Sequence, residues 1–227
     1  MPPKIIYQDE NLLALDKPAG VSVQELGDWL AVAHPGCQLA HRLDKDTTGL
    51  ILVAKNQPTR DYLKQLFQTG GIKKTYLALV YGKVKNDSGA IDWPIGRSRK
   101  DPRKRIAGKG ATGKLREALT EYQVKEKFPS YTLLEARPRT GRTHQIRVHL
   151  KALGYPIVAD QLYAPASMLE KSAALPITRQ ALHAARLEFV APSGQSLKLE
   201  SPLPSDFAAT LAGLRHQNEH ARLKPRL

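Results

Sequence analysis

His41-Arg42-Leu43-Asp44-Lys45-Asp46-Thr47-Thr48-Gly49 leads directly into the apolar run Leu50-Ile51-Leu52-Val53-Ala54. Five consecutive apolar residues after a turn predict a buried strand. A buried strand holds the neighbouring loop in one position, and such loops often carry binding or catalytic groups. Asp44 could do chemistry there, or Asp44, Asp46 and Thr47 could only organise a turn through hydrogen bonds to the backbone. Periodicity alone favours the turn.

The composition is that of an ordinary soluble globular protein. The chain has 227 residues, 41% of them hydrophobic and 25% charged, which suffices for a real core. No apolar run reaches membrane-spanning length, and the N-terminus lacks the apolar core of a signal peptide. Cys37 is the single cysteine, which excludes an internal disulfide framework and a multi-cysteine zinc site. We therefore expect a cytoplasmic protein in a reducing compartment.

Charge is the most informative total. Thirty-five Lys and Arg against 21 Asp and Glu leave a net charge of +14, and a field of that sign attracts polyanions. The cations cluster, with nine in residues 97–116 and four more in residues 215–226. A solvated surface needs no such clustering, so the charge favours nucleic acid as the partner.

Hydrophobic periodicity and turn residues predict an α+β protein around a mostly antiparallel sheet. Strands are expected at residues 4–8, 12–16, 50–55, 72–81, 118–127, 130–136, 182–190 and 195–200. Helices are expected at 25–33, at 58–70, after an N-cap at Thr143, and from Ser205 onward with Phe207, Leu211 and Leu214 facing inward. The other long stretches are expected to be irregular: a polar loop at 82–115, residues 164–180, and a loose basic tail at 216–227.

Three further residues stand out by their chemistry. Tyr76 lies in an apolar strand, where it is either a core tyrosine or a flat surface on which a base can stack. Arg142 precedes a helix start, where an arginine is favoured only if an anion binds. Arg147 lies further along that helix, and it is either a solvated cation or the partner that keeps an active carboxylate charged.

The sequence offers little support for a metal or nucleotide cofactor. It contains seven histidines, but His144 and His149 are five residues apart, which is poor spacing for one helix face. Neither standard glycine-rich phosphate loop occurs. We expect no metal site and no cofactor.

Three separated motifs resemble the RluA family of pseudouridine synthases. They are His41-Arg42-Leu43-Asp44-x-x-Thr47-Thr48-Gly49-Leu50, Lys74-Thr75-Tyr76-x-Ala78-x-Val80-x-Gly82 and Gly141-Arg142-Thr143-His144-Gln145-Ile146-Arg147-Val148-His149, with Leu182-His183-Ala184 as the usual closing strand. Their order and separations are also similar to that family, over roughly residues 5–210. One departure is Ala159-Asp160, where the family often has Gly-Asp before an aromatic residue. It concerns the local turn rather than the chemistry.

The resemblance implies the pseudouridine synthase fold, a mixed, mostly antiparallel sheet flanked by helices and loops, with a central active-site cleft. It implies one catalytic domain over residues 1–215, followed by the basic tail 216–227. Many members carry a small N-terminal RNA-binding domain of the S4 type, whereas this sequence begins with the first strand of the catalytic domain. We therefore expect RNA to be held by the catalytic domain, its basic segment and its tail.

The resemblance also assigns roles. Asp44 would be the catalytic carboxylate, and Arg147 its basic partner. Tyr76 would stack on the target base and could take the proton from C5. Structured RNA, either rRNA or tRNA, would be contacted by Arg42 as a wedge in the space of the flipped base. The wider set of predicted RNA-binding residues is His41, Arg142, His144, Arg97, Arg99, Lys100, Arg103, Lys104 and Arg105.

The implied reaction converts uridine to pseudouridine within RNA. The N1–C1′ bond breaks, the uracil turns over, and C5 bonds to C1′; atoms and charge are conserved, so no cofactor is required. Two other functions stay open, a non-catalytic RNA-binding module and a metal-independent hydrolase built on Asp44 and a histidine. A monomer without an obligate protein partner is the default expectation.

Overall fold

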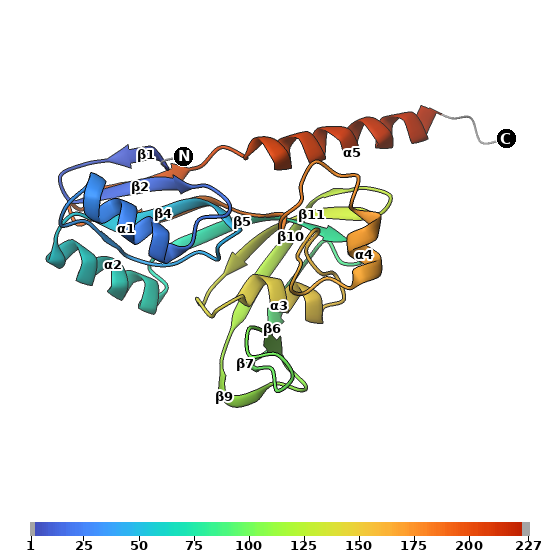
Figure 1. Cartoon of the computed structure of the whole chain (residues 1–227), viewed down its shortest axis with the longest axis horizontal. Coiled ribbons are helices and arrows are strands. Elements are labelled where there is room, and N and C mark those ends of the chain that lie inside the picture. Colours follow the sequence, from blue (N-terminus) through green and yellow to red (C-terminus); the bar gives the residue numbers. More distant parts are fainter. Residues whose placement is uncertain (1–2, 224–227) are drawn as a thin grey trace.

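A sheet of ten strands runs through the computed structural model, which describes residues 3–223 (Figure 1). Its strands, in chain order, are β1 (Lys4–Gln8), β2 (Leu12–Lys17), β3 (Gln38–Leu39), β4 (Thr48–Ala54), β5 (Lys73–Tyr81), β6 (Ser88–Asp92), β10 (Leu119–Lys127), β11 (Tyr131–Pro138), β12 (Leu182–Val190) and β13 (Ser196–Glu200). The helices are α1 (Val23–Ala33), α2 (Gln57–Thr69), α3 (Gln145–Ala152), α4 (Ala166–Lys171) and α5 (Ser205–Leu223).

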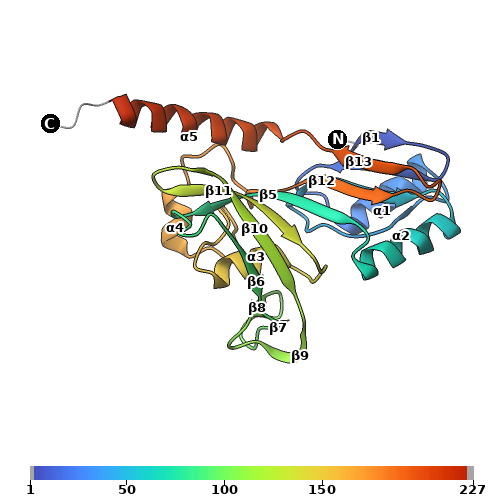
Figure 2. The same ribbon diagram turned by 180° about the vertical axis from the view of Figure 1, so that it is seen from behind.

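The strands lie in the order β1-β2-β4-β12-β5-β11-β10-β6, and β3 and β13 pair with β4 and β12. Strand β12 runs parallel to β4, and the other pairings are antiparallel. The predicted α+β class with a mixed, mostly antiparallel sheet is therefore confirmed. Strand β5 lies between β12 and β11 near the middle of the sheet, seen from behind in Figure 2.

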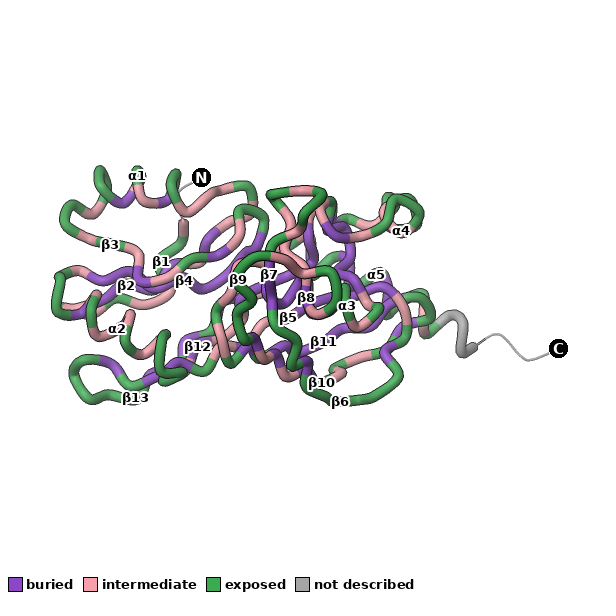
Figure 3. Tube along the Cα trace, turned by 90° about the horizontal axis from the view of Figure 1, so that it is seen from below, coloured by how far each residue is buried: buried purple, intermediate pink, exposed green. Residues whose placement is uncertain are grey.

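Strand β4 is buried along its whole length because helices cover both faces of the sheet there. Side chains alternate between the faces of a strand. Leu50 and Leu52 pack in one cluster with Leu63 of α2, whereas Ile51 and Val53 pack in another with residues of α1. The view from below shows α1 and α2 on opposite sides of the strands (Figure 3). The loop that precedes β4 is thus attached to the most deeply buried part of the sheet.

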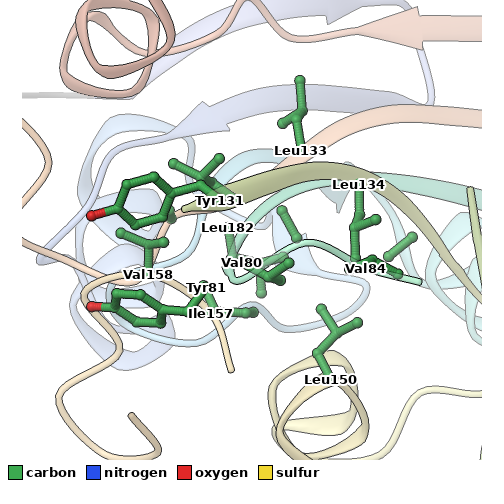
Figure 4. Packing of buried hydrophobic residues seen from close by; sticks show 14 of the residues in the cluster. Val80, Tyr81, Val84, Tyr131, Leu133, Leu134, Leu150, Ile157, Val158 and Leu182 are labelled. Carbon is green, nitrogen blue, oxygen red and sulfur yellow. The ribbon is translucent and has the colours of Figure 1, made fainter. Parts of the chain in front are cut away.

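The largest cluster of buried hydrophobic residues joins β5 and β11 to α3 and to the segment before α4. Val80, Leu134, Leu150 and Val158 are among its fully buried members (Figure 4). Helix α5 adds Phe207, Leu211 and Leu214, all buried as predicted from their spacing. This core holds α3 against the sheet beside β11.

The predicted polar loop at residues 82–115 is wrong. Strand β6 extends the main sheet, and three short strands form a second sheet in the order β8-β7-β9, namely β7 (Ile95–Arg97), β8 (Arg105–Ala107) and β9 (Thr112–Arg116). We call residues 95–116 the basic arm; it projects from the body in Figure 1. The short strands carry little apolar alternation. Buried Ile95 and Ala107 stabilise them by packing on α3 rather than through their own pattern.

Two other irregular stretches are also helical. Helix α4 lies within residues 164–180, and α5 continues through residues 216–223, so that part of the predicted loose tail is ordered. Residues 215–223 contain good helix formers and neither Gly nor Pro, which lets the helix propagate. The predicted tail cations Lys224 and Arg226 lie outside the described residues. Within residues 3–223, no helix is both long and apolar enough to cross a membrane.

Gly49 marks the point of closest approach between β4 and β12. It pairs with Ala184 in the parallel ladder and has a φ of 107°, in the range that favours glycine. A Cβ at this position would lie only 2.3 Å from the carbonyl oxygen of Ala184. The glycine of the charged segment is therefore required by contact between the strands.

We expect Gly49→Ala to lower the free energy of unfolding by about 2–5 kcal/mol, because it combines a backbone clash with an unfavourable φ. Gly27→Ala in α1 is the matched control, since a Cβ there would meet no atom within 4 Å. That control should be neutral or stabilise the protein by up to about 1 kcal/mol. Urea unfolding measures both, and equal effects of the two substitutions would contradict the clash.

Two fully buried histidines, His149 and His183, connect neighbouring segments through hydrogen bonds from both ring nitrogens. The Nε2–H of His149 donates to the carbonyl of Trp93, and its Nδ1 accepts from Thr120 Oγ1. The Nε2–H of His183 donates to the carbonyl of Ser201, and its Nδ1 accepts from the hydroxyl of Thr48. Burial lowers the pKa of both rings below the ordinary value of 6.5.

These lowered pKa values predict a loss of stability in acid. Below pH 6.5 the unfolded chain binds protons at these histidines that the folded chain does not bind. The free energy of unfolding therefore decreases as the pH is lowered. Between pH 7.5 and 5.5 we expect a decrease of about 1 kcal/mol for each histidine. Urea unfolding at the two pH values measures it, and His149→Gln should reduce the decrease. A protein equally stable at both pH values would contradict the prediction.

Candidate active site

A cleft of about 420 Å³ lies where the three sequence motifs meet. The cleft is lined by Asp44 and its neighbours, by Tyr76 of β5 and by the segment 138–147. A volume of this size is typical of ligand pockets in proteins. The fold thus brings together Asp44 and Arg147, which are 103 positions apart in the sequence.

Asp44, Arg147 and Asp160 form a continuous chain of charge-assisted hydrogen bonds. Arg147 Nη1 donates to Asp44 Oδ2 at 2.8 Å, while its Nε and Nη2 donate to the two oxygens of Asp160 at 2.7 and 2.8 Å. The side chain of Asp160 is 0% exposed, that of Arg147 is 8% exposed, and that of Asp44 is 17% exposed. Asp160 therefore fixes the guanidinium through a bidentate pair of hydrogen bonds, and Arg147 in turn holds one oxygen of Asp44.

The other oxygen of Asp44 faces the cleft. Its nearest charged or polar side-chain neighbour among the described ion pairs is His144, whose Nε2 lies 3.8 Å from Oδ1. That distance is too long for a hydrogen bond. Among the residues that the structure describes, Oδ1 of Asp44 therefore has no hydrogen-bond donor, whereas Oδ2 is fixed by Arg147. Burial lowers the pKa of Arg147, but the two carboxylates outweigh that effect and raise it, so the guanidinium stays charged.

The loop around Asp44 is held from below by a buried lysine. Lys17 at the end of β2 is fully buried, and its ammonium donates to the carbonyls of Pro18, Val21 and Lys45. Burial lowers its pKa to about 8. The side chain of Gln180 also donates to Thr47 Oγ1 at 2.6 Å. The loop geometry that the sequence could explain by a simple turn is in fact fixed by contacts from distant segments.

Tyr76 lies in β5 opposite Ala184 of β12 and Ala136 of β11. The two small alanines on either side leave room for its ring beside the cleft. Burial, and to a lesser extent the negative charge of Asp44, raise the pKa of the tyrosine hydroxyl well above its usual value. The hydroxyl is therefore protonated at neutral pH, and the aromatic face is the feature that Tyr76 presents.

Helix α3 begins one residue later than predicted. The N-cap is His144 rather than Thr143, and it has the left-handed φ of 58° with no side-chain cap bond. Gln145 takes over the task of closing the turn. Its Oε1 accepts from Thr140 Oγ1 and from the amide of Arg142, and its Nε2 donates to the carbonyl of Leu119. This polar turn fixes the entry of the helix that carries Arg147.

The predicted RNA-binding residues of the cleft fall into two groups. Arg42 is exposed at the cleft, and its side chain makes no hydrogen bond or ion pair within the part of the chain that the structure describes. Arg142 lines the cleft, and its Nε donates to the carbonyl of Glu117.

His41 packs inward instead. Its Nε2 accepts from the amide of Leu52, its ring lies 4.4 Å from that of Phe67, and burial lowers its pKa to about 3.

The other predicted RNA contacts lie outside the cleft on the basic arm. Arg97, Arg99, Lys100 and Arg103 are exposed, whereas Lys104 and Arg105 are half-buried. Arg103 makes a bidentate pair with Asp101. The arm is anchored to the body because its base packs against Val148 of α3 and against Tyr163. The basic block and the cleft are thus connected through α3, which contacts both.

Two residues of the site were not predicted from the sequence. Asp160 and Tyr163 belong to the segment in which Ala159 replaces the family's glycine. Ala159 has a left-handed φ of 56°, so the turn survives the substitution. Tyr163 lies under the guanidinium of Arg147, 4.9 Å from the ring centre. The sequence did contain a signal for both residues, because the segment Ala159–Tyr163 keeps the family's Asp and a following aromatic residue even though its glycine is replaced.

Comparisons with known proteins agree with this geometry. Residues 11–152 match the sequence model of the RNA pseudouridylate synthase family. A ribosomal large subunit pseudouridine synthase D of Nitrosomonas europaea is 42% identical over 95% of this chain and 66% of its own length. The corresponding protein of Pseudomonas aeruginosa is 38% identical over 95% of this chain and 73% of its own length. The chain therefore spans only part of the length of these relatives.

Solved structures give the same result. The human RNA pseudouridylate synthase domain containing 1 superposes with a TM-score of 0.80 and 28% identity, over 99% of this chain and 96% of the human one. The human RNA pseudouridylate synthase domain containing 4 superposes with a TM-score of 0.76 and 30% identity, over 93% and 92% of the two chains. From the three motifs, the shared fold and these matches, the chain belongs to the RNA pseudouridylate synthase family of enzymes.

Proposed function

We propose that this chain isomerises uridine to pseudouridine in rRNA, with Asp44 as the catalytic carboxylate. The observation that carries the proposal is the Asp44–Arg147–Asp160 chain of hydrogen bonds beside the half-buried Tyr76 in the cleft. It leaves one oxygen of Asp44 directed at the cleft and the other fixed. The relatives from Nitrosomonas europaea and Pseudomonas aeruginosa are named for the ribosomal large subunit, which supports rRNA as the substrate class.

The reaction needs a group that acts at the sugar or the base while the N1–C1′ bond breaks. A carboxylate that accepts a hydrogen bond from Arg147 is kept in one orientation, as a nucleophile or base must be. The uracil then turns over and C5 bonds to C1′, while C5 loses its hydrogen as a proton and N1, freed from the sugar, takes up a proton. No atom is gained or lost, so side chains alone can carry the reaction.

The target base must leave its stack before it can reach Asp44. Unstacking costs a few kcal/mol, and side chains that replace the lost contacts offset it. Exposed Arg42 at the cleft rim is suited to the vacated space in the RNA, and Tyr76 is suited to stacking on the flipped uracil. Because the hydroxyl of Tyr76 stays protonated, we assign it this stacking role rather than proton removal from C5.

Asp44→Asn should abolish pseudouridine formation, a loss of roughly 10⁴-fold or more, because the amide keeps the shape but removes the charge. Binding of the RNA should persist. The matched control is Asp46→Asn in the same loop, an exposed carboxylate for which we assign no role. Carbodiimide modification and primer extension on large-subunit rRNA and tRNA from cells lacking the gene, incubated with each variant, measure the product.

Each alternative function predicts a different outcome. A non-catalytic RNA-binding module would leave pseudouridine levels the same with and without the protein. A hydrolase would cleave the RNA or change the mass of the product, whereas isomerisation leaves the mass unchanged. Wild-type activity in Asp44→Asn, or equal loss in Asp46→Asn, would contradict the assignment of Asp44.

We expect the basic arm to contact RNA phosphates. Replacing three exposed cations of the arm by Ala should weaken RNA binding and reduce the slope of log Kd against log salt by about 0.7–0.9 for each lost contact. The control replaces three exposed lysines elsewhere on the sheet and should leave the slope nearly unchanged. The arm variant is Arg97, Arg99 and Lys100 to Ala, and the control variant is Lys4, Lys125 and Lys198 to Ala. Equal slopes in the two variants would exclude the arm as an RNA contact.

A further inference from the structure

The hydroxyl of Tyr163 joins the basic arm to the cleft. Tyr163 is buried, with 3% of its surface exposed. Its oxygen accepts from the backbone amide of Arg105 in β8 at 2.9 Å, and it lies 2.7 Å from Nδ1 of His144. One hydroxyl group therefore contacts both the arm and the histidine that stands beside Asp44.

The two contacts of this hydroxyl determine which ring nitrogen of His144 carries the proton. A backbone amide can only donate, so the Tyr163 oxygen is the acceptor from Arg105. The remaining O–H proton needs an acceptor, because a buried donor without a partner costs about 1–3 kcal/mol. His144 Nδ1 is the acceptor within reach, so Nδ1 is unprotonated. In the neutral ring the proton must then lie on Nε2.

The protonation state of the His144 ring is consistent with a proton on Nε2 alone. Burial lowers the pKa of His144, although the nearby carboxylates of Asp44 and Asp160 oppose that effect. The cations of Arg147 and Arg105 act in the same direction as burial. The ring is therefore neutral at neutral pH, and its tautomer is the quantity that remains to be fixed.

The Nε2–H of His144 then faces the reacting region. Nε2 lies 3.8 Å from Oδ1 of Asp44, the oxygen that Arg147 does not hold. The distance is too long for a direct hydrogen bond and leaves the donor available to a group that enters the cleft. The oxygens of a uridine, on the uracil or on the ribose, are acceptors of the required kind. The left-handed backbone of His144 keeps the ring at this place.

We propose that Tyr163 is a positioning residue that holds His144 as the neutral Nε2–H tautomer, so that His144 offers a hydrogen-bond donor to the target nucleotide beside Asp44. The donor role rests on the proposed function, whereas the tautomer does not. Because the same hydroxyl accepts from Arg105, the position of the basic arm and the orientation of His144 are linked through one side chain.

The tautomer can be measured directly in the full-length chain without RNA. Long-range ¹H–¹⁵N correlation spectra at pH 7.5 distinguish protonated from unprotonated imidazole nitrogens, and loss of one signal set in His144→Gln assigns the resonances. We expect Nδ1 of His144 to be unprotonated in the wild type. We expect Tyr163→Phe to shift the ring toward a mixture of tautomers. A wild-type ring protonated on Nδ1 would overturn the proposal whether or not the variant folds.

Kinetics test the consequence. Tyr163→Phe should lower kcat about tenfold, the equivalent of one neutral hydrogen bond, while Kd for RNA changes less than about twofold. The matched control is Tyr155→Phe, which also removes a hydroxyl that accepts from a backbone amide, that of Lys85, a residue that, unlike His144, does not line the cleft. The control should alter neither the tautomer nor kcat. An equal fall of kcat in both variants, or an unchanged tautomer in Tyr163→Phe, would overturn the positioning role.

The donor role has its own test. The amide of Gln reaches the place of Nε2, whereas the shorter amide of Asn does not, although Asn tolerates the left-handed backbone better. We therefore expect His144→Gln to retain more activity than His144→Asn. The opposite order would reject the donor at Nε2. Failure of the Asp44 test would overturn the proposed function while leaving the measured tautomer of His144 intact, so the two failures are distinguishable.

Discussion

The guanidinium of Arg147 sits between two carboxylates, and the organisation of the site depends on it. Asp160 takes two of its donors and leaves a third for Asp44, so a nearly buried cation is held with a net surplus of negative charge around it. Burying an ion is unfavourable unless its hydrogen bonds are satisfied, and this arrangement satisfies them with good geometry. Asp160, the more deeply buried carboxylate, thereby fixes Asp44 through the arginine. Asp44, the proposed catalytic group, is therefore positioned by Asp160 indirectly, through Arg147.

The rest of the fold serves to bring these three residues together. Asp44 belongs to the loop before β4, Arg147 to α3 and Asp160 to the turn that follows α3. The loop is held where β4 meets β12, at the glycine that allows their backbones to approach. The helix is held by the core shared with β5 and β11. A small displacement of the loop before β4 or of helix α3 would separate Asp44 from Arg147. The buried polar contacts around the cleft restrict such displacements.

The same buried contacts join the cleft to the basic arm. The arm packs on α3 and Tyr163, and its connections are reinforced by His149 and by the backbone amide of Arg105. The cations that are proposed to attract RNA and the carboxylate that is proposed to act on it therefore both contact one helix, the arm by packing on α3 and Asp44 through Arg147. In this proposal, long-range charge brings the polyanion to the surface, and short-range hydrogen bonds set the geometry at the point of reaction.

The sequence by itself determined most of the regular elements and singled out the residues that are proposed to carry the chemistry. The unbroken apolar run after Gly49 predicted a buried strand, the spacing of Phe207, Leu211 and Leu214 predicted the buried face of α5, and three motifs singled out Asp44, Tyr76 and Arg147. These features are local, since each is encoded by neighbouring residues or by a fixed period. Only the tertiary structure decided that Asp160 grips Arg147, that Lys17 supports the loop, that His41 packs inward and that the basic block folds into strands. Each of these depends on contacts between segments far apart in the chain, where packing rather than local pattern selects the partner.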